Sequence, residues 1–193
     1  MSDIAIFKEM IKQTATVSLE NYHGKNQVTL KEPPPANYSV TIYGMPDDDQ
    51  TVVIKADAFT APKDIFTNSK HECKRADFII VAEIDGKQII ICIEMKRGHA
   101  GSEVEIIQQL KGAKCFVAYC REIGQSFWNH ENFLKDSVYR FVSIRNISIP
   151  KRTTRPIGST EIHDHPERML KISNPKGLQF NYLARVSARK KTT

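Results

Sequence analysis

The segment ADFIIVAEIDGKQIIICIEMK, residues 76–96, decides the fold of this chain. Two apolar runs flank the pair Asp85-Gly86, and an Asp-Gly pair between apolar runs is a strong signal for a β-hairpin with a two-residue turn. Both runs are apolar at almost every position, so the side chains on both faces of the two strands should be buried. We therefore expect a pair of central strands in a sheet that is covered on both sides.

The sequence on either side of this hairpin predicts helices and further strands. Ser2 can cap a helix of roughly residues 3–20, and strands are expected at 38–44 and 50–59, joined by the polar turn 45–49. A second helix should begin at Ser102, because Ser102 and Glu105 form an S-x-x-E capping box. The apolar stripe of this helix is Ile106, Leu110, Ala113 and Val117.

The C-terminal quarter predicts one strand around 139–149 and a β-hairpin that turns at residues 174–177. The order helix, strands, helix, strand indicates an α/β or α+β fold with a mixed central sheet and flanking helices. We expect a core of residues 1–149 and a basic C-terminal extension of residues 150–193, with a hairpin and a tail.

Composition and charge limit the class of protein. The chain has 193 residues and no apolar run near the ~20 that span a bilayer, so no membrane partner is expected. The N-terminus does not resemble a signal peptide, and the four cysteines show no CxxC pair, which favours reduced thiols in a cytoplasmic protein. Residues 1–143 carry a net charge of −2 and residues 144–193 carry +8. A basic lobe of this kind suits binding to a polyanion, although a solubilising tail would have the same composition.

The hairpin also predicts which side chains face each other. A two-residue turn at Asp85-Gly86 pairs Ile84 with Lys87, and continuing this register sets Asp77 opposite Glu94. Their Cβ atoms should then lie about 4.5–5.5 Å apart on one face. Lys96 joins this face because side chains alternate along a strand.

Two facing carboxylates destabilise a sheet unless their charge is compensated. A divalent cation such as Mg²⁺ would compensate them, since Mg²⁺ binds one or two carboxylates together with water and phosphate oxygens. The alternative is an ion network without metal, in which Lys96 and Arg75 neutralise the two acids.

The pattern Asp77, a gap of 16 residues, then Ile93-Glu94-Met95-Lys96 at the end of an apolar strand resembles the PD-(D/E)xK, or restriction-endonuclease-like, nuclease superfamily. The resemblance covers residues 3 to about 149 and implies an α-β-β-β-α-β core. It further implies a Mg²⁺-dependent nuclease, with Mn²⁺ as an alternative cofactor. Asp77 and Glu94 would bind the metal, and Lys96 would assist the attacking water and stabilise the transition state.

The resemblance implies two further candidates. Some branches of the superfamily place a glutamine on the helix after the motif, and Gln109 is the residue of this chain at that place. Many members use a glutamate from the first helix, for which Glu9 and Glu20 are both candidates. DNA is the expected partner, and a homodimer is an open alternative because many nucleases of this core dimerise.

Two other readings of the function remain open. A non-catalytic nucleic-acid-binding or assembly subunit could retain the same core, and a nuclease of this class could act on RNA. Three weaker motifs are more typical of solvated residues. Asp47 belongs to a Pro-Asp pair that matches the first letters of the superfamily motif, and Glu72 begins a second Glu-x-Lys pattern. The third motif is the His163-Asp164-His165 run.

Overall fold

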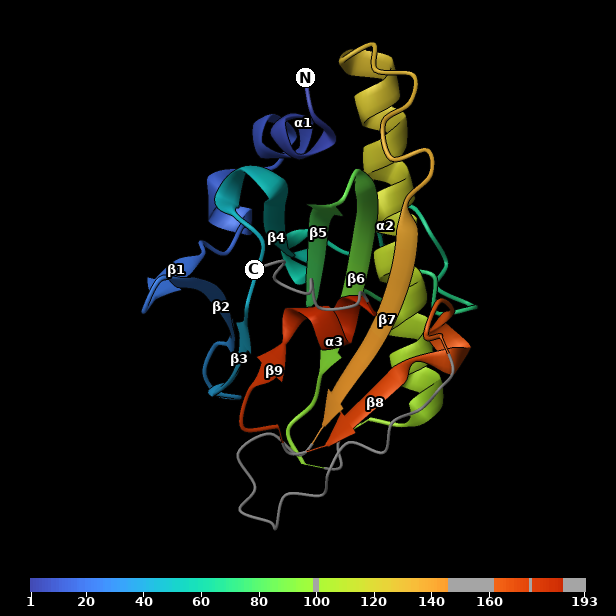
Figure 1. Cartoon of the computed structure of the whole chain (residues 1–193). Coiled ribbons are helices and arrows are strands. Elements are labelled where there is room, and N and C mark those ends of the chain that lie inside the picture. Colours follow the sequence, from blue (N-terminus) through green and yellow to red (C-terminus); the bar gives the residue numbers. More distant parts are fainter. Residues whose placement is uncertain (99–100, 146–161, 174, 186–193) are drawn as a thin grey trace.

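The protein has a mixed α+β fold built on two sheets (Figure 1). The computed structural model describes residues 1–98, 101–145, 162–173 and 175–185. The predicted fold class is confirmed. None of the helices in these residues is long and apolar enough to cross a membrane.

The larger sheet has five strands and contains the predicted hairpin at its centre. In spatial order its strands are β4 (Thr51–Lys55), β5 (Phe78–Ile84), β6 (Lys87–Met95), β7 (Val138–Arg145) and β8 (Leu170–Ser173). Strands β4, β5 and β6 are antiparallel, whereas β6, β7 and β8 are parallel. The sheet is therefore mixed, as expected, and both strands of the hairpin have a neighbour on each side.

A second sheet of four strands covers one face of the first. Its spatial order is β1 (Glu20–Tyr22), β2 (Lys25–Glu32), β3 (Tyr38–Tyr43) and β9 (Leu178–Gln179). Alternate residues of β2 and β3 point inward, and Val28, Leu30 and Ile42 pack in one core with Ile80 and Ile91 of the hairpin.

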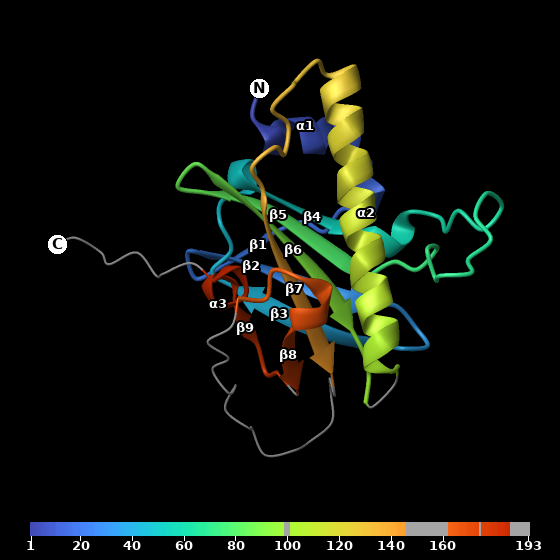
Figure 2. The ribbon, with the colours of Figure 1, turned by 90° about the vertical axis from the view of Figure 1, so that its right-hand side faces the viewer.

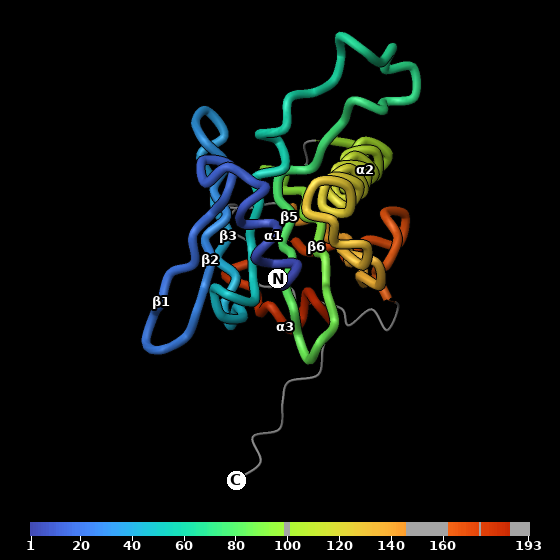
Figure 3. Tube along the Cα trace, turned by 90° about the horizontal axis from the view of Figure 1, so that it is seen from above, coloured from blue at the N-terminus to red at the C-terminus, as the bar shows by residue number. Residues whose placement is uncertain are grey.

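Helices cover the other face of the five-stranded sheet. Helix α1 (Asp3–Met10) and helix α2 (Glu103–Phe127) pack against the opposite side chains of the hairpin, such as Ile79 and Ile90. The view from above places β1–β3 and α2 on opposite sides of β5 and β6 (Figure 3). The hairpin is thus buried on both faces, which explains why its two runs are apolar at almost every position.

Helix α2 begins where the capping box predicts. The Ser102 side chain accepts a hydrogen bond of 3.1 Å from the Glu105 backbone N–H, and the predicted stripe is buried against the sheet. Figure 2 shows this helix running the length of the molecule. Short 3₁₀ turns occur at Gln13–Ala15, Asp48–Gln50, Ala56–Ala58 and Pro166–Arg168, and a last helix, α3, spans Phe180–Ala184.

The element order α1, β4, β5, β6, α2, β7 is the expected α-β-β-β-α-β sequence. The strands β1, β2 and β3 are inserted between α1 and β4 and form most of the second sheet. The two strands expected on either side of the 45–49 turn therefore exist, but they belong to different sheets.

The first helix is shorter than predicted. It ends at Met10, because Ile11 already has an extended backbone, and the predicted extension to residue 20 is wrong. The Val17 N–H donates a hydrogen bond of 2.9 Å to the Val53 carbonyl, so this segment lies along the edge of β4. The apolar residue Val17 fitted a helical spacing but is used beside a strand.

The predicted C-terminal hairpin is also wrong. Strand β8 is parallel to β7 in the larger sheet and β9 is parallel to β3 in the smaller one, so the two do not pair. Residues 180–184 are helical, with Phe180 and Leu183 buried in the core between the sheets. The two strands on either side of residues 174–177 therefore belong to different sheets, β8 to the larger and β9 to the smaller.

Part of the C-terminal prediction lies outside the described residues, namely 146–149 of the expected strand and the basic clusters at 151–155 and 188–191. Among the described cations of this region, Arg168 pairs with Asp164 at 2.6 Å and Lys171 pairs with Glu103 at 2.7 Å. All four cysteines are free thiols, as expected.

Candidate active site

The turn at residues 85–86 sets the geometry of the candidate site. Asp85 and Gly86 have φ values of 50° and 72°, the left-handed conformation that a two-residue hairpin turn of type I′ requires at both positions. The strands pair from Ile84 opposite Lys87 to Phe78 opposite Ile93. One step further along this register sets Asp77 opposite Glu94, as the sequence predicts.

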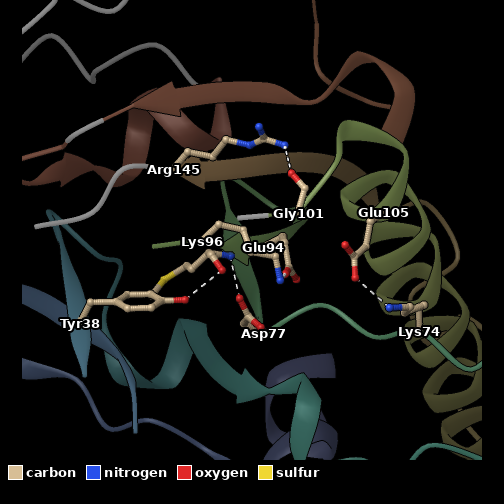
Figure 4. Close-up of polar contacts among 9 residues, drawn as sticks. Tyr38, Lys74, Asp77, Glu94, Lys96, Gly101, Glu105 and Arg145 are labelled. Atoms are coloured by element: carbon tan, nitrogen blue, oxygen red, sulfur yellow. Dashed lines mark hydrogen bonds and ion pairs between the residues drawn. The ribbon is translucent and has the colours of Figure 1, made fainter. Parts of the chain in front are cut away.

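Both carboxylates are held at the open end of the hairpin (Figure 4). The Asp77 carboxylate accepts a hydrogen bond of 2.6 Å from the Met95 backbone N–H. Glu94 is fully buried, and its Oε1 lies 2.6 Å from the Lys96 ammonium nitrogen. Within the described residues, Glu94 Oε2 has no hydrogen-bond partner. Two acids and one amine therefore converge here, and the buried Oε2 of Glu94 is available to bind a cation.

Burial dominates the electrostatics of the two acids. It raises the pKa of Asp77 to about 7, with the negative charge of Glu32 as the next cause. It raises the pKa of Glu94 to about 8, with the charge of Asp77 as the next cause. The hydrogen bond from Met95 and the charge of Lys96 act in the opposite direction but do not outweigh burial. Without a bound cation, this pair of carboxyl groups retains a proton near neutral pH.

For the pKa of Lys96, the neighbouring charges outweigh burial. Burial alone would lower its pKa, but the adjacent carboxylates of Glu94 and Asp77 outweigh burial and raise it. The amine is therefore charged at neutral pH, and about a fifth of its side chain is exposed.

The second sheet adds an acid that the sequence analysis missed. Glu32 lies opposite Tyr38 in the β2–β3 ladder, so the two side chains leave the same face. The Tyr38 hydroxyl donates a hydrogen bond of 3.0 Å to the Met95 carbonyl, which brings this end of the ladder up to the hairpin. Burial is the main cause that raises the pKa of Glu32, and the charge of Asp57, in the 3₁₀ turn after β4, is the next. Glu32 is 45 residues before Asp77, and no short motif connects the two in sequence.

The two candidate glutamates near the N-terminus have other contacts. Glu9 accepts a hydrogen bond of 2.9 Å from the indole N–H of Trp128, which ties α1 to the end of α2. Glu20 is on β1 rather than on the first helix, and it accepts a hydrogen bond of 3.2 Å from the side chain of Gln27. Glu32, rather than either of these, is the glutamate whose charge acts on Asp77.

Gln109 lies on α2 and lines a cavity with Lys74 and Arg75. Its amide oxygen is buried and has no hydrogen-bond partner in the described residues. Arg75, which the metal-free alternative required as a counterion, also has two buried guanidinium nitrogens without a partner there. Among the described residues, the contacts that compensate the acids are the Lys96 ammonium beside Glu94 and the Met95 N–H that donates to Asp77.

The residues of the three weaker motifs make hydrogen bonds or close polar contacts elsewhere in the fold. Asp47 is exposed and accepts a hydrogen bond of 2.8 Å from the side chain of Asn26. Glu72 is also exposed and accepts a hydrogen bond of 2.8 Å from the Lys70 N–H. The expectation that this run is solvated is wrong for His163, which is buried with its Nε2 2.8 Å from the Leu183 carbonyl. Burial lowers its pKa, so it is a neutral core residue.

The donor set suits a hard divalent cation. The described residues contain no group of three or more His, Cys, Asp or Glu side chains arranged to hold a metal, so a cation here would have two carboxylate ligands. Two carboxylates completed by water and a substrate oxygen are typical of Mg²⁺. The unpartnered Oε2 of Glu94 is the atom of this structure that fits such a ligand best.

Comparisons with protein-family models, with curated proteins and with solved structures gave no match to this chain. The function therefore has to be inferred from the side chains of the site.

Proposed function

We propose that this protein is a divalent-cation-dependent nuclease of the PD-(D/E)xK type, with DNA as the expected substrate. The observation that carries the proposal is the position of Asp77 opposite Glu94, one residue beyond the last strand pair, Phe78 with Ile93. Lys96 lies 2.6 Å from the buried Glu94. The order α-β-β-β-α-β around this hairpin supports it.

Asp77 and Glu94 would hold the cation, Mg²⁺ or Mn²⁺. Their raised pKa values mean that the pair binds a proton readily, and a cation would replace that proton and take up the same negative charge. When bound, the ion would lower the pKa of a water ligand and polarise a phosphoryl group. The apolar surroundings of Glu94 strengthen its electrostatic interaction with any bound charge.

Lys96 would act as a fixed positive charge. Because its pKa is raised, the ammonium keeps its proton at neutral pH and is not suited to accept one from water. It can donate hydrogen bonds to the attacking water or to a phosphoryl oxygen, and it can stabilise the negative charge that develops there. The Glu94 carboxylate holds the ammonium in place for this role.

A cleavage assay tests the proposal directly. Plasmid DNA, linear DNA and RNA are incubated with the purified protein in Mg²⁺, Mn²⁺ or EDTA. We expect cleavage of DNA that requires a cation and that is lost in Lys96→Ala. The matched control is Lys111→Ala, which removes an exposed lysine of α2 that is also paired with a glutamate, Glu167.

Cleavage that persists unchanged in Lys96→Ala would contradict the mechanism. Binding of nucleic acid without cleavage in any cation would favour the non-catalytic subunit. Cleavage of RNA alone would assign the protein to the RNA-directed class.

A further inference from the structure

The polar cavity lined by Gln109, Lys74 and Arg75 has a volume of about 310 Å³ and lies between α2 and the loop that leads into β5. Its polar lining comes from Lys63, Asn68, Lys74, Arg75 and Gln109. Since one water occupies about 30 Å³ of liquid, the cavity has room for a phosphate group together with several waters. None of the described residues that line it is acidic.

Arg75 is the residue that marks this cavity as a binding site. Its Nε and Nη1 atoms are buried and have no hydrogen-bond partner among the described residues. A buried charged donor without a partner is costly, because it has lost its water and gained nothing in return. A guanidinium presents its donors as a planar fork that matches the oxygens of a phosphate.

The opposite wall of the cavity is held close to Arg75. Helix α2 approaches the loop at Gly112, where an added Cβ would lie 1.8 Å from the Lys74 carbonyl oxygen. Gln109 is one helical turn before Gly112 and also has a buried amide oxygen without a partner. That oxygen is an acceptor and does not itself bind an anion, but the N–H groups of the same amide can donate to an anion that Arg75 binds.

The cavity lies next to the carboxylate pair. Arg75 precedes Asp77 by two residues, so their Cα atoms are at most about 7 Å apart. On the other side, Lys74 pairs with Glu105 at 2.9 Å (Figure 4). A Cβ added to Gly101 would lie 3.3 Å from Lys96 Cε and 3.5 Å from Glu105 Oε2.

We propose that Arg75, with Gln109 and Lys63, binds a phosphate group of the nucleic acid whose neighbouring phosphodiester lies at Asp77 and Glu94. This inference rests on the proposed function. Phosphates recur every ~3.4 Å of axis along one strand, so a strand at the carboxylates brings further phosphates within reach of Arg75. Lys74 contributes less, because its charge is already matched by Glu105.

The test is a binding measurement on the full chain with a labelled short DNA duplex, with Ca²⁺ in place of Mg²⁺ and at several salt concentrations. Arg75→Gln should weaken binding about tenfold and reduce the slope of log affinity against log salt by about 0.9, the value of one phosphate contact. Arg75→Lys should keep the slope but bind more weakly than the native chain, since it retains the charge without the fork. The control is Arg121→Gln, which removes an exposed arginine of α2 that pairs with Glu122 and should change neither quantity.

The outcomes separate this inference from the proposed function. If Arg75→Gln is folded, as shown by an unchanged circular dichroism spectrum, and its affinity and slope equal those of the native chain, the phosphate site is refuted even if the protein cleaves DNA. If Arg75→Gln binds weakly but the native protein cleaves nothing, the phosphate site stands and the nuclease proposal fails.

Duplexes with 5′-phosphate and 5′-hydroxyl ends identify the source of the phosphate. An effect of Arg75→Gln on both would assign the site to an internal phosphodiester. An effect on phosphorylated ends alone would assign it to a terminal phosphate.

Discussion

Two Lys–Glu pairs lie close together at the start of α2, and they differ in almost everything but composition (Figure 4). Lys96 and Glu94 are 2.6 Å apart, with side-chain exposures of 21% and 0%. Lys74 and Glu105 are 2.9 Å apart, with exposures of 37% and 39%. The pKa of Glu94 is raised, by burial first, whereas the pKa of Glu105 is lowered, by its hydrogen bond to Lys74 first.

The difference shows that the surroundings, rather than the partner, decide what an ion pair can do. In the exposed pair, water solvates both groups and the lysine tips the balance toward the charged carboxylate. In the buried pair, the cost of removing Glu94 from water and the nearby charge of Asp77 exceed what one lysine returns. Glu94 is left with unsatisfied affinity for a positive charge, and a bound cation would satisfy it.

The largest expected effect distinguishes the two glutamates by activity. Glu94→Gln should reduce cation-dependent cleavage about 10³-fold or more, because it removes a metal ligand from a buried site. Glu105→Gln should change cleavage less than about threefold, because an exposed pair contributes little. Rates of plasmid cleavage in Mg²⁺ measure both variants. Equal losses of cleavage rate in Glu94→Gln and Glu105→Gln would show that the buried pair has no special role in activity.

The second prediction concerns the acid that the smaller sheet supplies. Glu32→Gln should raise the Mg²⁺ concentration for half-maximal cleavage by about 10- to 100-fold, the range for residues that support metal ligands. Glu20→Gln is the matched control, since Glu20 is on the same sheet but pairs with Gln27 away from the site. A Mg²⁺ dependence in Glu32→Gln that equals the native one would mean that Glu32 affects only the metal-free protein.

The contrast between Glu94 and Glu32 also shows what the sequence could predict. The pairing of Asp77 with Glu94 follows from a turn of two residues, and the register of a hairpin is fixed locally once the turn is known. The capped start and the buried stripe of α2 follow from local signals in the same way. Glu32 reaches the site only because two sheets pack face to face, and that contact has no local signal.

The errors at the two ends of the chain have a related cause. The spacing of the apolar residues between 3 and 17 fitted a helix, but the Val17 N–H donates its hydrogen bond to the Val53 carbonyl at the edge of β4. The turn-forming residues at 174–177 suggested that the flanking strands pair with each other, but each strand joins a different sheet. A turn signal predicts a change of direction and leaves the choice of partner to tertiary packing.

The third prediction uses pH to separate the pairs. The raised pKa values of Asp77 and Glu94 mean that the native state holds protons that the unfolded chain loses above about pH 4.5. The free energy of unfolding in EDTA should therefore fall as pH rises from about 5 to 8, by more than about 1 kcal/mol. Glu105 has the opposite sign, since its lowered pKa contributes stability that is lost as pH falls.

Thermal unfolding in EDTA at several pH values measures this effect as the difference between the native chain and Asp77→Asn. The variant should show a flatter dependence, and Mg²⁺ should stabilise the native chain most at the alkaline end, because a cation competes with protons for the same oxygens. A pH dependence unchanged by Asp77→Asn would place the protons elsewhere.

The smallest expected effect is the coupling within the exposed pair itself. A double-mutant cycle of Lys74→Gln and Glu105→Gln, measured by denaturant unfolding, should give about 0.2–1 kcal/mol and should shrink in high salt. The same cycle on a buried pair is not a clean measure, because removing Lys96 leaves Glu94 free to take up a proton. A coupling in the exposed pair well above 1 kcal/mol would show that Lys74 and Glu105 are held more rigidly than their exposure indicates. The coupling free energies of the two pairs would then be similar, and the pairs would differ mainly in whether the glutamate holds a proton at neutral pH. In that case the nearby charge of Asp77, more than burial, would set the chemistry of the candidate site.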